Sequence, residues 1–148
     1  MTYNHLKNKS KDQLIEIILS ENLEKTSCTS DAVDSIWSLD INQNQENFIL
    51  LCLDSCNQVL KKTILFKGGI SQCSIDIRLI FNEVLKTDKC IKFIVAHNHP
   101  TGNLQPSNPD LVLTERIKKG AELLSLSFLD HIIFSKFKYF SFIEEGLI

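Results

Sequence analysis

The sequence predicts a single α/β domain in which helices flank a mixed sheet. Nearly continuous apolar runs of strand length, such as Phe48–Leu53, alternate with segments whose apolar residues follow helical spacing. Several of the strands are adjacent and form hairpins, with only one or two crossovers, which is typical of a sheet covered by helices. At 148 residues the chain has the usual length of one domain.

Residues 1–40 are predicted to form a short helical appendage, too small to fold as an independent domain. Ser10–Gln13 has the form of a capping box and is followed by apolar residues at helical spacing, which predicts a helix to about Asn22. A second short helix is expected to begin at a cap provided by Ser30 or Asp31.

Residues 41–148 are predicted to form the main domain. The expected elements are, in order, a strand over Phe48–Leu53, a returning hairpin strand over Val59–Phe66, a helix over Ile75–Leu85 capped by Ser74, a strand over Ile91–His97, a helix over Leu111–Leu124 and two closing strands near Phe128–Phe134 and Tyr139–Phe142. Gly68-Gly69 interrupts the chain after the hairpin, and Gly120 is a weak point in the last helix.

The charge balance argues against some classes of partner. Sixteen basic and eighteen acidic residues give a net charge of −2, which provides no global attraction to nucleic acid or to a membrane surface. No segment approaches the roughly 20 apolar residues of a membrane span. The five cysteines form no C-x-x-C pair and follow no export signal, so free thiols in the cytoplasm are expected.

Two histidines one residue apart carry the main functional signal. His97 and His99 end an apolar strand, where side chains two apart point to the same face and are able to bind one ion together. Asp110 follows eleven positions after His99, beyond a loop that contains all three prolines of the chain. Three ligands with an open fourth position are the layout of catalytic zinc.

Other interpretations of these residues remain open. Ser107–Asp110 matches a helix capping box, in which Asp110 would only satisfy backbone donors, although both roles are compatible. Asn98 is expected to point away from the two histidines by strand alternation. His131 is either close to the site or, as the more common case, a core histidine bonded to Asp130 or to backbone.

The whole pattern resembles a known signature. His-x-His, ten residues and then Asp, with Ser three positions before that Asp, is similar to the motif of the JAMM (JAB/MPN+) metalloproteases. The fuller string over His97–Asp110, with Thr114 following, resembles the RadC-like branch, which usually has serine where Thr101 stands. Glu46-Asn47-Phe48, Gly68-Gly69, Arg78 and Asp130-His131 resemble further RadC landmarks, so the resemblance covers about residues 30–148.

This resemblance implies a mixed, largely antiparallel curved sheet flanked by helices, the JAB/MPN architecture shared with cytidine deaminases. It implies that His97, His99 and Asp110 bind Zn²⁺, that Glu46 is the general base and that Ser107 helps to hold the developing oxyanion. The implied activity is hydrolysis of peptide or isopeptide bonds, with a protein or peptide as the substrate.

Two other functions compete with hydrolysis. JAB domains also occur as non-catalytic interaction modules, which typically lack one or more ligands, whereas this chain has the whole set. An HNH nuclease is the third candidate, but its residues are spread along a ββα unit. By family association the chain is linked to DNA repair or mobile elements. Residues 1–40 contain no Gly-rich hairpin between helices, so direct DNA binding of that kind is not expected.

Overall fold

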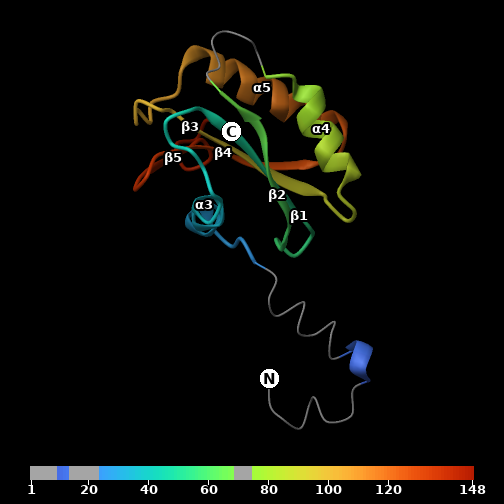
Figure 1. The fold of residues 1–148 in the computed structure, drawn as a ribbon. Helices are drawn as coiled ribbons and strands as arrows, with labels where there is room; N and C mark the ends of the chain where they lie inside the picture. The colour runs from blue at the N-terminus through green and yellow to red at the C-terminus, as the bar shows by residue number, and fades with distance from the viewer. Residues whose placement is uncertain (1–9, 14–23, 69–74) are drawn as a thin grey trace.

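The computed structural model describes residues 10–13, 24–68 and 75–148 (Figure 1). Within them the predicted capping box is present, because the Ser10 N–H donates to Gln13 Oε1 at 3.0 Å and the Gln13 N–H donates to Ser10 Oγ at 3.2 Å. The rest of the helix predicted to run to Asn22 lies outside the described residues, as does Gly69.

The centre of the fold is a five-stranded sheet with strand order β2-β1-β3-β4-β5. The strands are β1 (Asn47–Leu53), β2 (Val59–Lys67), β3 (Lys92–Asn98), β4 (Ser127–Phe134) and β5 (Tyr139–Ser141). Only β3 and β4 run parallel, since the crossover between them contains a helix, and the other neighbouring pairs are antiparallel. The predicted mixed, largely antiparallel sheet is confirmed.

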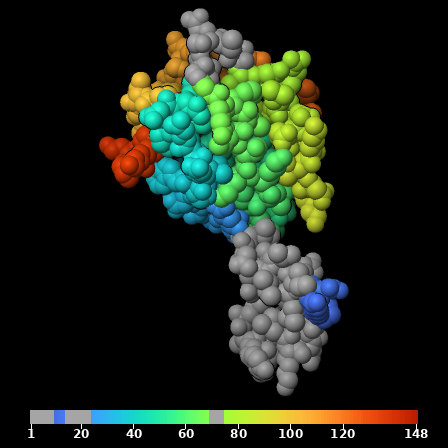
Figure 2. Space-filling model, in the orientation of Figure 1, coloured from blue at the N-terminus to red at the C-terminus, as the bar shows by residue number. Residues whose placement is uncertain are grey.

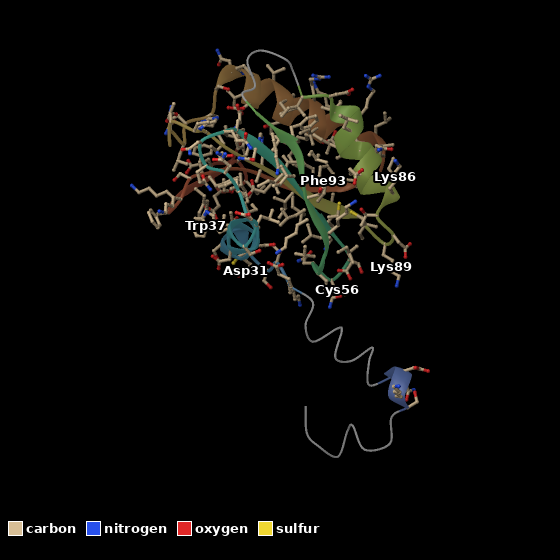
Figure 3. The ribbon with its side chains drawn as sticks, in the orientation of Figure 1. Asp31, Trp37, Cys56, Lys86, Lys89 and Phe93 are labelled. Atoms are coloured by element: carbon tan, nitrogen blue, oxygen red, sulfur yellow. The ribbon has the colours of Figure 1, made fainter. Side chains whose placement is uncertain are left out.

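Helices cover both faces of this sheet. The helices are α3 (Thr29–Trp37), α4 (Ile77–Lys86) and α5 (Asn108–Leu123). Helices α4 and α5 pack on one face and α3 on the other (Figure 1), so every residue of the interior strand β1 is buried. In Figure 3 Phe93 lies among the side chains of this interior, while Lys86 and Lys89 lie at its rim.

The segment around α3 joins the core of the domain. Ala32, Val33 and Ile36 pack with Ile49 and Leu51 on the face of the sheet opposite to α4 and α5. In the space-filling view this blue to cyan segment forms a continuous surface with the green hairpin strands (Figure 2). The division of the chain at residue 40 stays a prediction.

The predicted starts of α3 and α4 are wrong. The cap of α3 is Cys28 rather than Ser30 or Asp31. Asp31 is the third residue of the helix, and its carboxylate accepts hydrogen bonds from the N–H groups of Ser27 and Cys28. Asp76 caps α4 and accepts from the Arg78 N–H at 3.0 Å, and the predicted cap Ser74 lies outside the described residues. Helix α5 begins at Asn108, directly after the Ser107 of the predicted capping box, whereas its apolar pattern begins at Leu111.

The capping box predicted before α5 is confirmed. The Ser107 hydroxyl accepts from the Asp110 N–H, and Pro109 is tolerated in a first turn because its missing N–H has no helical partner there. Within the described residues no helix is long and apolar enough to cross a membrane.

Candidate metal centre

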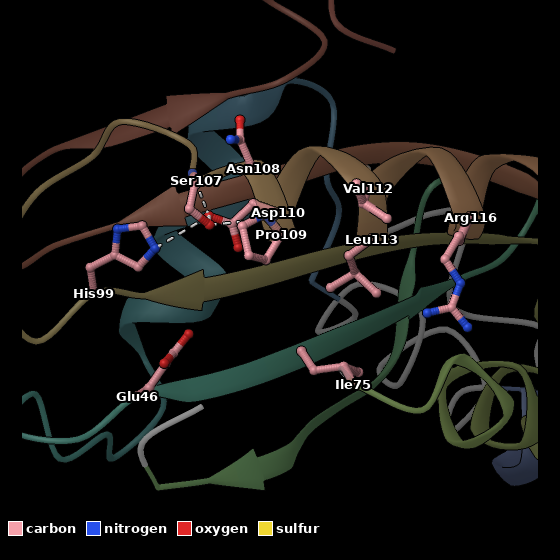
Figure 4. Close-up of a pocket in the computed structure, with 10 residues that line it drawn as sticks. All are labelled: Glu46, Ile75, His99, Ser107, Asn108, Pro109, Asp110, Val112, Leu113 and Arg116. Atoms are coloured by element: carbon pink, nitrogen blue, oxygen red, sulfur yellow. Dashed lines mark hydrogen bonds and ion pairs between the residues drawn. The ribbon is translucent and has the colours of Figure 1, made fainter. Parts of the chain in front are cut away.

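Strand pairing brings the predicted site residues together. Strands β1 and β3 are antiparallel, with Phe48 opposite His97, so Glu46 just before β1 lies beside His99 just after β3. The loop after β3 then returns the chain to the sheet as α5, whose first turn holds Asp110 close to both histidines (Figure 4). Residues fifty positions apart thus meet at one end of the sheet.

The two histidines face one point. Their Nε2 atoms lie 3.0 Å apart, while Nδ1 of His99 lies 2.6 Å from the Asn103 carbonyl oxygen and must donate to it. In the neutral ring of His99 the lone pair therefore lies on Nε2, the atom that faces His97. Asn98 points to the other face, as alternation predicts, and its side chain bonds Asn47 and Gln45.

Asp110 combines the two roles that the sequence left open. Its Oδ2 accepts from the Ser107 N–H at 2.8 Å and from the Ser107 hydroxyl at 2.6 Å, as in a capping box. The same carboxylate lies 3.3 Å from His97 Nε2 through Oδ1 and 3.6 Å from His99 Nε2 through Oδ2. The cap therefore orients a carboxylate that also faces the histidines.

The electrostatics of the cluster favour an ionised aspartate. Burial opposes ionisation of Asp110, but the imidazoles of His97 and His99 that face it outweigh burial and hold the carboxyl pKa well below its usual range. The facing Asp110 carboxylate in turn raises the pKa of His99. A fixed negative charge beside two imidazoles is a suitable site for a cation.

Glu46 lies within reach of the same point. One ligand atom each from Glu46, His97 and His99 all lie within 4.8 Å of one another, so these three residues could also hold a metal ion. The backbone carbonyl of Glu46 accepts from the Gly68 N–H at 2.9 Å, and Gly68 has a φ of +117°, a conformation that favours glycine. Two carboxylates thus flank the two histidines.

The separations fit a tetrahedral ion. Zinc bonds of 2.0–2.1 Å place neighbouring ligand atoms about 3.3 Å apart. His97 Nε2 and His99 Nε2 lie 3.0 Å apart, and each faces its own oxygen of the Asp110 carboxylate, Oδ1 at 3.3 Å from His97 and Oδ2 at 3.6 Å from His99. The residues present therefore fit a zinc-sized cation, and their N₂O donor set is one that zinc accepts.

His131 contacts the cluster, although a bond to Asp130 or to backbone was the more common expectation. Its Nε2 lies 2.9 Å from His97 Nδ1, and its Nδ1 lies 2.6 Å from the Thr114 hydroxyl. Asp130 instead accepts from the Ser141 hydroxyl and the Ile143 N–H. Burial lowers the pKa of the fully enclosed His131 well below its ordinary value. The register of the parallel pair β3 and β4 makes this contact, and no sequence pattern reveals that register.

A cavity opens onto the cluster. Its volume is about 570 Å³, and its wall begins at Glu46, His99, Ser107 and Asp110. It continues along α5 over apolar side chains to Arg116 (Figure 4). A second cavity of about 310 Å³ lies on the other side of His99, lined by Pro100 and by residues 135–138. The cluster is therefore accessible to a ligand.

A helix-flanked mixed sheet with a His-x-His and carboxylate cluster at one end defines a JAB-type domain. A model of the RadC-like JAB domain matches residues 26–147. The chain belongs to the RadC-like JAB domain family.

Relatives of known sequence agree with this assignment. A UPF0758 protein of Flavobacterium johnsoniae is 37% identical over 125 residues, which are 84% of this chain and 54% of the relative. A UPF0758 protein of Haemophilus ducreyi is 44% identical over 103 residues, which are 70% of this chain and 46% of the relative. A UPF0758 protein of Methanosarcina barkeri is 32% identical over 134 residues, which are 90% of this chain and 58% of the relative. The chain thus spans about half the length of the curated relatives it matches.

Proposed function

We propose that the protein is a zinc-dependent hydrolase of peptide or isopeptide bonds. The observation that carries the proposal is the meeting of His97 Nε2 and His99 Nε2 at 3.0 Å with the Asp110 carboxylate, whose two oxygens lie 3.3 and 3.6 Å from them, beside Glu46 in the wall of the cavity. His97, His99 and Asp110 would hold the ion and leave its fourth position facing the cavity.

Each remaining residue has a defined task in this proposal. A bound zinc ion would acidify a water molecule and polarise the scissile carbonyl. The Glu46 carboxylate would take the proton of the attacking water and deliver it to the leaving nitrogen. The Ser107 hydroxyl, which donates to Asp110 Oδ2 in the structure, would turn to donate to the developing oxyanion, a contribution of about 3 kcal/mol for a well-placed donor.

The cavity supports a peptide substrate. Beyond the cluster it is lined by Ile75, Val112 and Leu113, which would contact apolar side chains, and its volume is in the range of small-ligand sites. The net charge of −2 gives no support to a nuclease. A role in DNA repair or with mobile elements has only family association behind it.

The proposed location is the cytoplasm. Within the described residues Cys28, Cys52, Cys56 and Cys90 are free thiols. A reducing compartment keeps thiols in this state.

The test begins with zinc content. Wild type should contain about one zinc per chain by elemental mass spectrometry, and His97→Ala and Asp110→Asn should lose it. Glu46→Gln should keep zinc but lose at least about 100-fold in turnover of a peptide or isopeptide library hit, as expected for removal of a general base. Zinc binding without any turnover would favour a non-catalytic JAB interaction module. Turnover that Glu46→Gln leaves unchanged would overturn the proposed mechanism, because Glu46 would not be the general base.

A further inference from the structure

A line of buried hydrogen bonds runs from α5 through β4 to the metal centre. The Thr114 hydroxyl donates to the Asp110 carbonyl oxygen at 2.7 Å and lies 2.6 Å from His131 Nδ1. His131 Nε2 lies 2.9 Å from His97 Nδ1, and His97 Nε2 faces His99 and Asp110. The described structure thus connects Thr114 to the far side of a proposed metal ligand.

The Asp110 carbonyl oxygen, at the Thr114 end of the line, decides which group donates in each of these hydrogen bonds. A carbonyl oxygen only accepts, so the single hydroxyl hydrogen of Thr114 is used by Asp110, and the Thr114 oxygen must accept from His131 Nδ1–H. In a neutral His131 ring, Nε2 then has no hydrogen and accepts from His97 Nδ1–H. The proton of His97 is thereby held on the side away from the cluster.

The opposite direction would block the site. If the Thr114 hydroxyl donated to His131 Nδ1, His131 Nε2–H would donate to His97 Nδ1. A neutral His97 would then carry its proton on Nε2, the atom that faces His99 and Asp110. A protonated nitrogen has no lone pair for a metal ion, so the two directions differ in their capacity to bind zinc.

The surroundings protect this arrangement from water. His131 has 0% exposure, and Phe142 stacks on its ring at a centroid distance of 4.6 Å and an interplanar angle of 16°. Phe48 stacks on His97 at 6.2 Å. Hydrogen bonds between buried rings are stronger where no water competes for them.

We propose that His131, held by Thr114, is a positioning residue that fixes the Nδ1–H tautomer of His97 and so prepares His97 Nε2 as a metal ligand. This inference rests on the metal centre of the proposed function. Partners of this kind behind a ligating histidine typically contribute 10–100-fold to metal affinity.

The test uses a matched pair of variants at position 114. Thr114→Val keeps the shape of the side chain but removes the hydroxyl, whereas Thr114→Ser keeps the hydroxyl. The tautomer of His97 is measured by ¹⁵N imidazole NMR on metal-free protein, and zinc affinity by competition with a chelator. Thr114→Val should raise the Nε2–H population of His97 and weaken zinc binding about 10-fold. Thr114→Ser should restore both properties.

A second variant keeps the test decisive if the first disturbs α5. His131→Phe preserves the ring that stacks on Phe142 and removes the acceptor for His97, with thermal unfolding as the folding control. Loss of zinc affinity with an unchanged His97 tautomer, in either folded variant, would overturn the proposal. Wild type that binds no zinc would count against the proposed function instead, while the tautomers of the metal-free proteins would still decide the role of His131.

Discussion

The side-chain oxygen of Asn98 accepts hydrogen bonds from the backbone N–H of Asn47 at 2.8 Å and from its side-chain nitrogen at 3.0 Å. Both residues are completely buried, and the Asn98 amide donates to the Gln45 carbonyl oxygen at 2.9 Å. These bonds tie the segment that carries Glu46 to the end of β3, on the face opposite to His97. The distance between Glu46 and the histidines therefore depends on a polar contact outside the cluster.

Replacing Asn98 by Ala should destabilise the domain by about 1–3 kcal/mol, because it leaves the buried backbone N–H of Asn47 without a partner. The side-chain amide of Asn47 keeps its bonds to the carbonyl oxygens of Asn42 and Gln45. Urea unfolding of the metal-free protein measures this loss. Asn82→Ala, on the exposed surface of α4, is the matched control and should change stability by less than about 0.5 kcal/mol. Equal stability of the two variants would show that the Asn98 contacts are dispensable.

Zinc should stabilise the folded protein. At a free concentration of 100 times its Kd, a ligand that binds only the native state adds about 2.7 kcal/mol to the free energy of unfolding. We expect a rise in Tm of about 5–10 °C, measured by calorimetry with and without a chelator. His97→Ala should abolish this rise, whereas His5→Ala should retain it. A zinc effect that survives His97→Ala would point to binding elsewhere.

Ser107→Ala should lower both the stability of the protein and its affinity for zinc. The variant loses a helix cap, which contributes about 1 kcal/mol, and frees the Asp110 carboxylate from the 2.6 Å bond that orients it. Thermal unfolding and zinc titration measure the two effects separately. Ser107→Thr retains the hydroxyl and should lie close to wild type in both. If Ser107→Ala left the zinc affinity unchanged, the bond between Ser107 and Asp110 would not be needed to orient Asp110 for zinc binding.

Gly120→Ala should destabilise the protein, although alanine is the better helix former. A Cβ atom added at position 120 would lie 2.6 Å from Cε2 of Phe81, so the α4 side chain would have to move. The expected cost is about 1–3 kcal/mol. Phe81→Leu in the same chain should reduce this cost, and a double-mutant cycle of unfolding free energies measures the coupling. Additive effects of the two substitutions would contradict the proposed clash.

Asp130 should make stability depend on pH. Burial raises its pKa from the ordinary 3.8 to about 6. The folded state therefore binds more protons than the unfolded state between about pH 4 and 6, and this contribution to stability falls as the pH rises through that window. Asp130→Asn removes the ionisation. The unfolding free energy of the variant relative to wild type should increase by up to about 3 kcal/mol from pH 4 to pH 7. A constant difference would contradict the raised pKa.

Most elements could be predicted because their signals are local. The continuous apolar runs of β1 and β3 and the capping residues before α5 depend on neighbours in sequence, as does the alternation that separates Asn98 from His97 and His99. The helix starts of α3 and α4 were wrong because several polar residues near each start are suitable caps. Only the local geometry decides which of them bonds the free N–H groups.

The sequence alone determined the strand and helix pattern, the His-x-His pair and its aspartate, and the family. Only the tertiary structure decided which residues form hydrogen bonds with the ligand His97 and with its neighbour Asn98. The link from His97 through His131 to Thr114 depends on the register of the parallel strands, and the Asn98–Asn47 contact depends on the antiparallel pairing of β1 and β3. Register is a property of long-range packing between two strands, so no periodicity within either strand contains it.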